Sequence, residues 1–262
     1  MRSKHIIYCV FLLSSMGLIK AQDYSAYKKA RFVQQSDTLQ YRILWPENFS
    51  EDQQYPVVLF LHGAGERGHD NKTQLVHGAT LFLDPENRKK YPAIVIFPQC
   101  PKGEYWSNAI IDRSKTGRAK FDYRQQGPPG TSLRLVMALI DKMVAEPFTK
   151  DNQIYVGGLS MGGMGTFELL SRKPNTFAAA FPICGGGNPQ MADSYARNTA
   201  LWVFHGAKDD VVDPSFSKEM VAAIEKAGGK PRFTLYKDAN HNSWDPAFAE
   251  PELLSWLFSY KK

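Results

Sequence analysis

The chain of 262 residues lacks several features that mark common classes of protein. It has no Gly/Ser-rich or Pro-rich linker and no repeat, so a division into several domains is not indicated. Its histidines and cysteines show no metal-ligand spacing, so we expect neither a metal nor an organic cofactor. The net charge of +6 falls to about +3 without the first 21 residues, and so small an excess predicts no nucleic-acid partner.

The longest hydrophobic run lies near the N-terminus, and it is too short to span a membrane as a helix. Ile6–Ile19 follows Arg2 and Lys4 and precedes Ala21. A basic start, an apolar centre and a small residue at the end are typical of a signal peptide. We therefore expect residues 1–21 to be a signal peptide. We expect residues 22–262 to be periplasmic or secreted, with no stable membrane insertion after cleavage.

Cysteine is rare in the mature chain, where only Cys100 and Cys184 remain. Each follows an apolar run of strand length, which is typical of a small buried thiol. An oxidising compartment would also allow the two to pair. Neither thiol has the sequence context of a nucleophile.

Apolar runs of strand length alternate with helical patterns over residues 22–262. This alternation predicts a single α/β domain with a mostly parallel central sheet and helices on both faces. The expected strands are 31–35, 39–45, 55–61, 93–98, 153–157, 177–183, 201–205 and 232–236. The expected helices are 131–144, 163–172, 214–227 and 252–259.

The most informative motif is Gly158-Leu159-Ser160-Met161-Gly162, which stands between a strand and a helix. In that context, G-x-S-x-G places the serine at a sharp turn with its hydroxyl above the sheet edge. Larger residues than glycine on either side would collide with the neighbouring strand and helix. Ser160 is therefore the predicted nucleophile.

A serine nucleophile needs a base and an orienting acid, and in this architecture the acid precedes the histidine. His241 lies in a late loop after the strand 232–236, so it is the predicted base. The candidates for the acid are Asp209, Asp210, Asp213 and Asp238. Asp213 precedes a helical stretch as an N-cap does, and Asp238 lies only three residues before the histidine. Asp209 is therefore preferred, with Asp210 second.

Backbone amides are the expected donors to the oxyanion of a tetrahedral intermediate. One is the amide of Met161, the residue after the nucleophile. The other lies in the glycine-rich loop 62–68, which follows the strand 55–61. We assign it to Ala64, with Gly65 as the alternative.

These residues resemble the α/β-hydrolase superfamily, and more narrowly its phospholipase/carboxylesterase and feruloyl-esterase-like branch, which includes prolyl-oligopeptidase-like members. The matching motifs are Leu61-His62-Gly63 with Gly65 and Gly68, Gly158–Gly162, His205-Gly206-x-x-Asp209 with Val212, and Asn240-His241 with Trp244. The resemblance runs from Leu39 to the C-terminus and implies an α/β-hydrolase fold. It also favours Asp209 as the acid.

Substrate-binding residues are expected in the long unpatterned stretch Cys100–Gly130, which follows a strand end. The resemblance places Trp106 near the acyl or alcohol pocket. Trp244, three residues after His241, is the second predicted wall. Aromatic walls suit sugars or phenolic acyl groups.

Together these features predict a secreted serine hydrolase that cleaves small-molecule or polysaccharide-linked carboxylic esters through an acyl-enzyme. The resemblance suggests acetyl or feruloyl esters of plant polysaccharide. The alternatives are a serine peptidase of the prolyl-oligopeptidase type and a catalytically silent carbohydrate- or lipid-binding protein on the same scaffold. A peptidase would need acidic side chains to bind a peptide amino terminus, and only Glu66 and Glu104 are available near the site.

Overall fold

The computed structural model describes residues 22–112, 120–123 and 127–262, so the predicted signal peptide, residues 1–21, lies outside the described residues. The strands are β1 (Lys28–Gln34), β2 (Asp37–Leu44), β3 (Tyr55–Leu61), β4 (Ile94–Gln99), β5 (Ile110–Asp112), β6 (Lys120–Asp122), β7 (Thr149–Leu159), β8 (Ala179–Ile183), β9 (Ala200–Gly206) and β10 (Arg232–Tyr236). The α-helices are α1 (Ala79–Leu83), α2 (Pro85–Lys90), α3 (Thr131–Val144), α4 (Met161–Arg172), α5 (Pro214–Lys226), α6 (Trp244–Phe248) and α7 (Leu253–Ser259). Three short 3-10 helices are η1 (Ala64–Glu66), η2 (Thr73–Leu75) and η3 (Pro189–Ser194).

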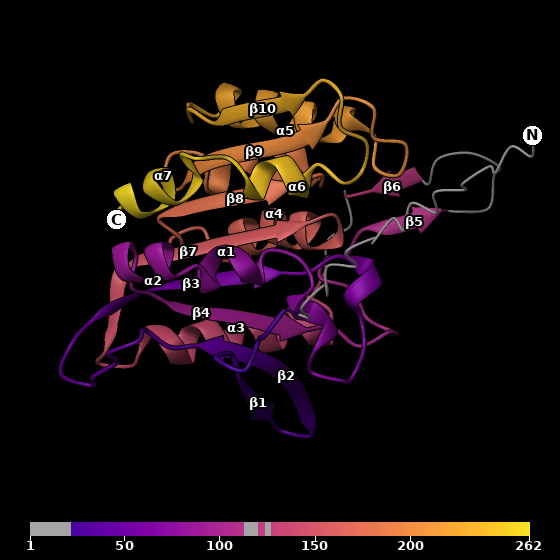
Figure 1. Ribbon diagram of the computed structural model, residues 1–262. Helices are drawn as coiled ribbons and strands as arrows, with labels where there is room; N and C mark the ends of the chain where they lie inside the picture. The colour runs from indigo at the N-terminus through magenta and orange to yellow at the C-terminus, as the bar shows by residue number, and fades with distance from the viewer. Residues whose placement is uncertain (1–21, 113–119, 124–126) are drawn as a thin grey trace, which may run out of the picture.

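A central sheet of eight strands runs in the order β1-β2-β4-β3-β7-β8-β9-β10 (Figure 1). The six strands from β4 to β10 pair in parallel, whereas β2 pairs antiparallel with both β1 and β4. The short β5–β6 hairpin forms a separate sheet at the right-hand end of the molecule. The mostly parallel sheet predicted from the sequence is therefore confirmed.

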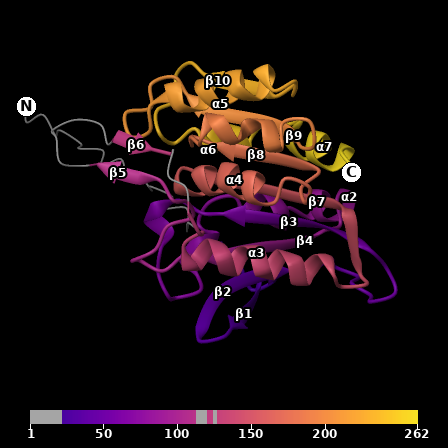
Figure 2. The ribbon, with the colours of Figure 1, turned by 180° about the vertical axis from the view of Figure 1, so that it is seen from behind.

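Helices cover both faces of the sheet. Figure 1 shows α1, α2, α6 and α7 in front of it, and the reverse view in Figure 2 shows α3, α4 and α5 on the other face. Each face has its own hydrophobic core, because alternate residues of a strand point to opposite sides. In β3, for example, Val57 and Leu59 belong to the core under α3 to α5, whereas Val58 and Phe60 belong to the other core.

The burial of the strands follows from their position in the sheet. All seven residues of β3 are buried, as expected for a central strand covered on both faces. The edge strand β10 has only exposed or partly exposed residues and pairs with β9 alone. The central strand β3 is therefore packed on both faces, whereas the edge strand β10 has fewer packing contacts.

Most predicted elements are present, and three match the prediction at both ends: β3, α3 and β10. The helix expected at 163–172 begins two residues earlier, directly after Ser160. Helices α1, α2 and α6 were not predicted, because helices of five or six residues show too few turns for a periodicity. Among the described helices, none combines the length and the hydrophobicity needed to cross a bilayer.

Candidate active site

The centre of the site is the turn between β7 and α4, where Ser160 has a left-handed φ of 52°. The turn fits only because glycines flank the serine. A Cβ atom on Gly162 would lie 1.9 Å from the carbonyl oxygen of Leu61, and one on Gly158 would lie 2.3 Å from the carbonyl oxygen of Gly162. The amide of Ser160 donates to the carbonyl oxygen of Ile183 at 2.9 Å. The strained serine is thus held by strand β8 on one side and by close backbone packing on the other.

His241 lies in the loop after β10, and its ring bridges the serine and a carboxylate. Nε2 is 3.0 Å from Oγ of Ser160, and Nδ1 is 2.8 Å from Oδ2 of Asp209. Since a carboxylate only accepts hydrogen bonds, Nδ1 carries the proton and Nε2 is left to accept the serine hydroxyl proton. The side-chain oxygen of Asn240 accepts from the amides of His241 and Asp210, which ties this loop to the loop after β9.

Among the four acidic candidates, the structure brings Asp209 to the histidine. Asp210 is exposed, and Asp238 forms an exposed ion pair with Lys208. Asp213 caps helix α5 by accepting from the amide of Ser215, as predicted from its position before Pro214.

The Asp209 carboxylate is fully buried, yet every side of it is hydrogen-bonded. Oδ1 accepts from the amides of Val211 and Val212, both at 2.9 Å, and Oδ2 accepts from His241. Burial alone would raise the pKa of Asp209, but the hydrogen bonds from His205 and His241 outweigh it and hold that pKa well below its usual range. The carboxylate is therefore a permanent negative charge beside His241.

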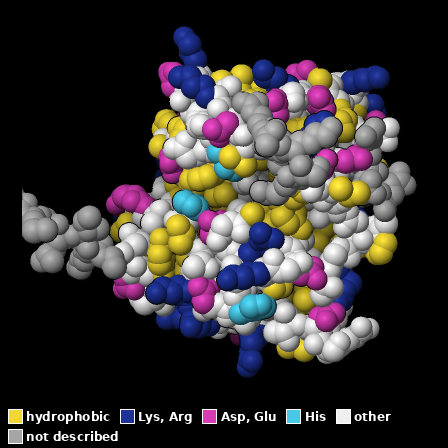
Figure 3. Space-filling model, turned by 90° about the vertical axis from the view of Figure 1, so that its right-hand side faces the viewer, with side chains coloured by type: hydrophobic (Ala, Val, Ile, Leu, Met, Phe, Trp, Pro, Cys, Tyr) yellow, Lys and Arg dark blue, Asp and Glu magenta, His cyan; other side chains and the backbone are white. Residues whose placement is uncertain are grey.

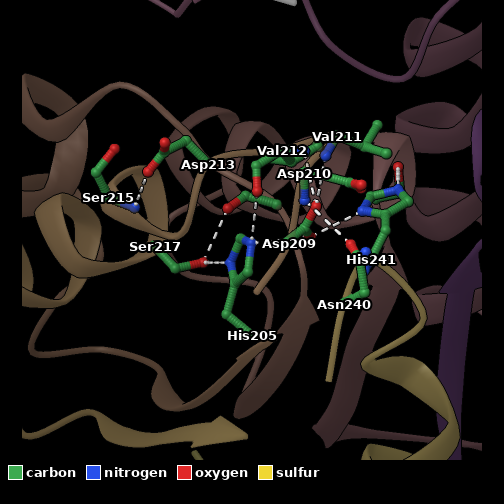
Figure 4. A network of polar contacts seen from close by, with 12 residues as sticks. His205, Asp209, Asp210, Val211, Val212, Asp213, Ser215, Ser217, Asn240 and His241 are labelled. Carbon is green, nitrogen blue, oxygen red and sulfur yellow. Dashed lines mark hydrogen bonds and ion pairs between the residues drawn. The ribbon is translucent and has the colours of Figure 1, made fainter. Parts of the chain in front are cut away.

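A second histidine, His205 at the end of β9, supports the same carboxylate (Figure 4). Its Nε2 lies 3.2 Å from Oδ2 of Asp209 and 3.0 Å from the carbonyl oxygen of Val212. Both neighbours are acceptors, so Nε2 carries a proton. Nδ1 lies 2.7 Å from Oγ of Ser217, which lies 2.9 Å from the carbonyl oxygen of Gly185. The sequence analysis missed this role, although His205 stands in the motif that led to Asp209.

One amide predicted to bind an oxyanion belongs to the residue after Ser160, and the other belongs to a residue that lines the same pocket as Ser160. Met161 is the first residue of α4, and Ala64 begins the 3-10 helix η1 in the loop after β3. Neither amide donates to another group among the described residues. The guanidinium of Arg67 fixes the loop, because its Nε donates to the carbonyl oxygen of Ala64 and its Nη1 to that of Lys102.

His62, the first residue of this loop, holds it to Cys100, the residue after β4. Its Nε2 accepts from the amide of Cys100 at 3.0 Å, so the ring proton is on Nδ1, which faces the carbonyl oxygen of Gly63 at 2.6 Å. Burial lowers the pKa of His62 to about 4. The imidazole is therefore neutral at neutral pH and acts as a fixed brace.

The prediction that Trp106 contacts substrate is wrong. Its side chain is fully buried, and its Nε1 donates to the carbonyl oxygen of His62 at 3.1 Å. The ring packs against His62 at 5.3 Å between ring centres, and Gly165 of helix α4 lies directly against its Cβ. Trp106 is thus a core residue beneath the oxyanion loop.

Trp244, in contrast, lies in the wall of a pocket of about 230 Å³ that opens above Ser160. The ring packs between His77 and His241, at 5.1 and 5.4 Å between ring centres. The face shown in Figure 3 is the end of the molecule with the β5–β6 hairpin, and hydrophobic side chains gather there beside histidines. The remaining pocket walls come from Gly63, Ala64, Gly65, Glu66, Tyr105, Phe121, Leu159, Met164, Val211 and Val212.

Two further predictions concern the substrate loop and the two cysteines. Residues 113–119 and 124–126 of the expected substrate loop lie outside the described residues. Cys100 and Cys184 are both buried and form no disulfide. Cys184, Asp209 and His241 have ligand atoms within 4.8 Å of one another, but burial and the Asp209 charge raise the pKa of the Cys184 thiol. Asp209 and His241 already hydrogen-bond to each other at 2.8 Å, and we assign no metal to these residues.

Comparisons with known proteins place the candidate residues inside one family match. Residues 118–250 match the family described as phospholipase/carboxylesterase, and this region contains Ser160, Asp209 and His241. A bifunctional acetylxylan esterase/xylanase of Neocallimastix patriciarum is 30% identical over 158 residues, which are 60% of this chain and 20% of that protein. A probable carboxylesterase of Oryza sativa subsp. japonica is 28% identical over 204 residues, 73% of this chain and 83% of that protein.

A solved thermostable esterase has the same fold, with a TM-score of 0.81 and 34% sequence identity. The match covers 91% of this chain and 64% of that one. The chain thus spans about a fifth of the fungal esterase/xylanase and somewhat less than two thirds of the thermostable esterase.

Proposed function

Because this chain belongs to the phospholipase/carboxylesterase family of α/β-hydrolases, we propose that it is a serine esterase with Ser160 as nucleophile. One observation carries the proposal: the hydrogen bonds from Ser160 to His241 at 3.0 Å and from His241 to Asp209 at 2.8 Å. This is the order in which a hydroxyl, a base and an orienting carboxylate must stand for acyl transfer. The proposed roles of these three residues rest on that geometry.

In the acylation step, Oγ of Ser160 attacks the ester carbonyl carbon while Nε2 of His241 takes the hydroxyl proton. The negative charge of Asp209 stabilises the imidazolium that forms, because that carboxylate stays ionised. The amides of Ala64 and Met161 donate to the oxyanion of the tetrahedral intermediate. His241 then gives its proton to the leaving alcohol, and the acyl group remains on Ser160.

In the deacylation step, water replaces the alcohol. His241 takes a proton from the water, whose oxygen attacks the acyl carbon. The second tetrahedral intermediate collapses with return of the proton to Oγ of Ser160. The products are a carboxylic acid and a regenerated serine, and one water molecule is consumed.

The substrate that we propose is an ester of a small acyl group carried by a small molecule or by a polysaccharide. The pocket of about 230 Å³ supports a small acyl group, since its walls include the apolar side chains of Leu159, Met164 and Val212. The acetylxylan esterase/xylanase named above points to acetyl groups on a plant polysaccharide. Action outside the cytoplasm follows from the signal peptide predicted at residues 1–21.

The first test is hydrolysis of p-nitrophenyl acetate by residues 22–262, compared with Ser160→Ala. We expect a loss of at least roughly 10³-fold in kcat, because the acyl-enzyme cannot form. Ser255→Ala is the matched control, since the hydroxyl of this exposed serine on α7 donates to the carbonyl oxygen of Glu252, one turn away from it in the chain. Intact mass after a fluorophosphonate probe shows whether one residue is labelled, and loss of the label in Ser160→Ala identifies that residue.

Three outcomes are distinguished by this design. Loss of activity and of probe labelling in Ser160→Ala alone supports the esterase. Equal background rates in the wild-type and Ser160→Ala proteins contradict it and favour the silent binding protein. Faster turnover of peptide p-nitroanilides than of esters would assign the same serine to a peptidase.

A further inference from the structure

One carboxylate in the pocket has no role in the steps described so far. Glu66 lies in the loop that carries the oxyanion donor Ala64 and lines the same pocket as Ser160. Its Oε2 atom is buried and has no hydrogen-bond partner among the described residues. Most other walls of this pocket are apolar side chains or backbone. A buried acceptor without a donor is costly, and because the Glu66 side chain as a whole is 15% exposed, a small turn of the carboxylate brings it to a donor on a ligand.

The backbone that carries this carboxylate is held by two hydrogen bonds and lies close to Gly63. The carbonyl oxygen of Glu66 accepts from Oγ1 of Thr73 at 3.1 Å and from Nε2 of Gln99 at 3.3 Å. A Cβ atom on Gly63 would lie 2.9 Å from Oε2, so only glycine leaves room for the carboxylate there. The segment that carries the acceptor is therefore held in place before any ligand arrives.

A contact with His77 does not satisfy the carboxylate. Nε2 of His77 lies 3.8 Å from Oε1 of Glu66, which is beyond hydrogen-bond distance, and the contact does not involve Oε2. His77 also lines the pocket. A ligand in the pocket would therefore contact both the Glu66 carboxylate and the His77 imidazole.

These side chains lie on the side of the pocket where the alcohol leaves. In the proposed mechanism, His241 hands a proton to the leaving oxygen, so the alcohol lies beside that ring. A continuous wall leads from there to the carboxylate: His241 packs against Trp244, Trp244 packs against His77, and His77 faces Glu66. The alcohol part of an ester would therefore extend along Trp244 toward Glu66.

We propose that Glu66 accepts a hydrogen bond from a hydroxyl group on the alcohol part of the substrate, so that the enzyme selects esters of polyols. The inference rests on the proposed serine-esterase function. A site built around a hydrogen-bond acceptor discriminates strongly against an analogue that lacks the donor, because the buried acceptor is then left unpaired. Trp244 supplies an apolar face for the carbon skeleton of the same alcohol.

The test compares 2-hydroxyethyl acetate with propyl acetate, in which a methyl group replaces the hydroxyl. The quantity is the ratio of the two kcat/KM values in wild type, Glu66→Met and Glu66→Gln. We expect Glu66→Met to lower this ratio by roughly tenfold to a hundredfold, as for loss of a hydrogen bond to a charged group. Glu66→Gln, which keeps the shape and one acceptor, should lower it by less. Glu225→Met, an exposed glutamate on α5, is the control and should leave it unchanged.

Protonated 2-(dimethylamino)ethyl acetate separates a hydroxyl from a cationic donor. If only this ester loses kcat/KM in Glu66→Gln and Glu66→Met, the carboxylate recognises an ammonium group and the polyol assignment is overturned. A ratio within threefold of wild type in both Glu66 variants also overturns it, while Ser160-dependent hydrolysis continues. If none of the proteins shows Ser160-dependent hydrolysis, the proposed esterase function is contradicted, and the selection of polyol esters falls with it. Should Glu66→Met fail to fold, Glu66→Gln carries the comparison.

Discussion

The buried imidazole of His62 makes the stability of this protein depend on pH in a defined window. Burial lowers its pKa from 6.5 to about 4, so the unfolded chain binds a proton at a higher pH than the folded protein does. The stability that comes from keeping this ring neutral is fully present above pH 6.5 and is lost as the pH falls toward 4. A difference of about 2.5 pKa units corresponds to about 3 kcal/mol in the free energy of unfolding.

The perturbation is His62→Gln, which removes the titrating group but keeps a donor and an acceptor near the amide of Cys100 and the carbonyl oxygen of Gly63. Urea unfolding at pH 7.0 and pH 4.5 gives the free energy of unfolding of both proteins. We expect the wild type to lose about 2.5 kcal/mol more than the variant over this interval, the share of the full effect reached at pH 4.5.

Taking the difference between the two proteins removes the contribution of groups that titrate in both. The opposite result is an equal loss of stability in the two proteins. If the wild type and His62→Gln lose the same free energy to within about 0.5 kcal/mol, the ring is not held neutral by burial, and its role as a brace between β3 and β4 is refuted.

Three further results follow from single contacts in the site. His205→Phe removes a donor from the buried Asp209 carboxylate, and we expect roughly a tenfold loss in kcat/KM for p-nitrophenyl acetate, with no loss if the donor is dispensable. Gly162→Ala places a Cβ atom 1.9 Å from a carbonyl oxygen, so soluble yield and the thermal unfolding midpoint should both fall sharply; an unchanged midpoint would contradict the packing at the elbow. Trp106→Phe should lower the unfolding midpoint and leave KM for esters within twofold, whereas Trp244→Ala should raise KM severalfold; the reverse pattern would restore Trp106 as a substrate wall.

Much of the fold was predictable because its central strands and longer helices have strong patterns. The seven apolar residues of β3 and the amphipathic helix α3 were predicted at their observed bounds. The resemblance to α/β-hydrolases is confirmed by the family match and by the thermostable esterase fold. The order of Ser160, Asp209 and His241 was also readable, because loops after parallel strands meet at one edge of the sheet. Their catalytic roles remain predictions.

What the sequence did not predict depends on the paths of loops. Trp106 follows a strand end, as a substrate wall would, but the loop turns its ring against His62 rather than into the pocket. Nothing in a linear pattern distinguishes these two directions. His205 was passed over because a histidine inside an apolar strand gives no sign of its partners. Its contact with Asp209 exists only because the chain turns sharply after β9.

The base of the proposed triad follows one of the two edge strands of the sheet. His241 follows β10, an edge strand with one neighbour and no fully buried residue, whereas Ser160 follows β7, which is held between β3 and β8. Segments with few buried contacts open locally at a lower free energy than the core. Fraying of this edge would separate His241 from Ser160 while both hydrophobic cores stay intact. We therefore expect mild denaturation to abolish activity before it changes the signals of the helices and of the hydrophobic core.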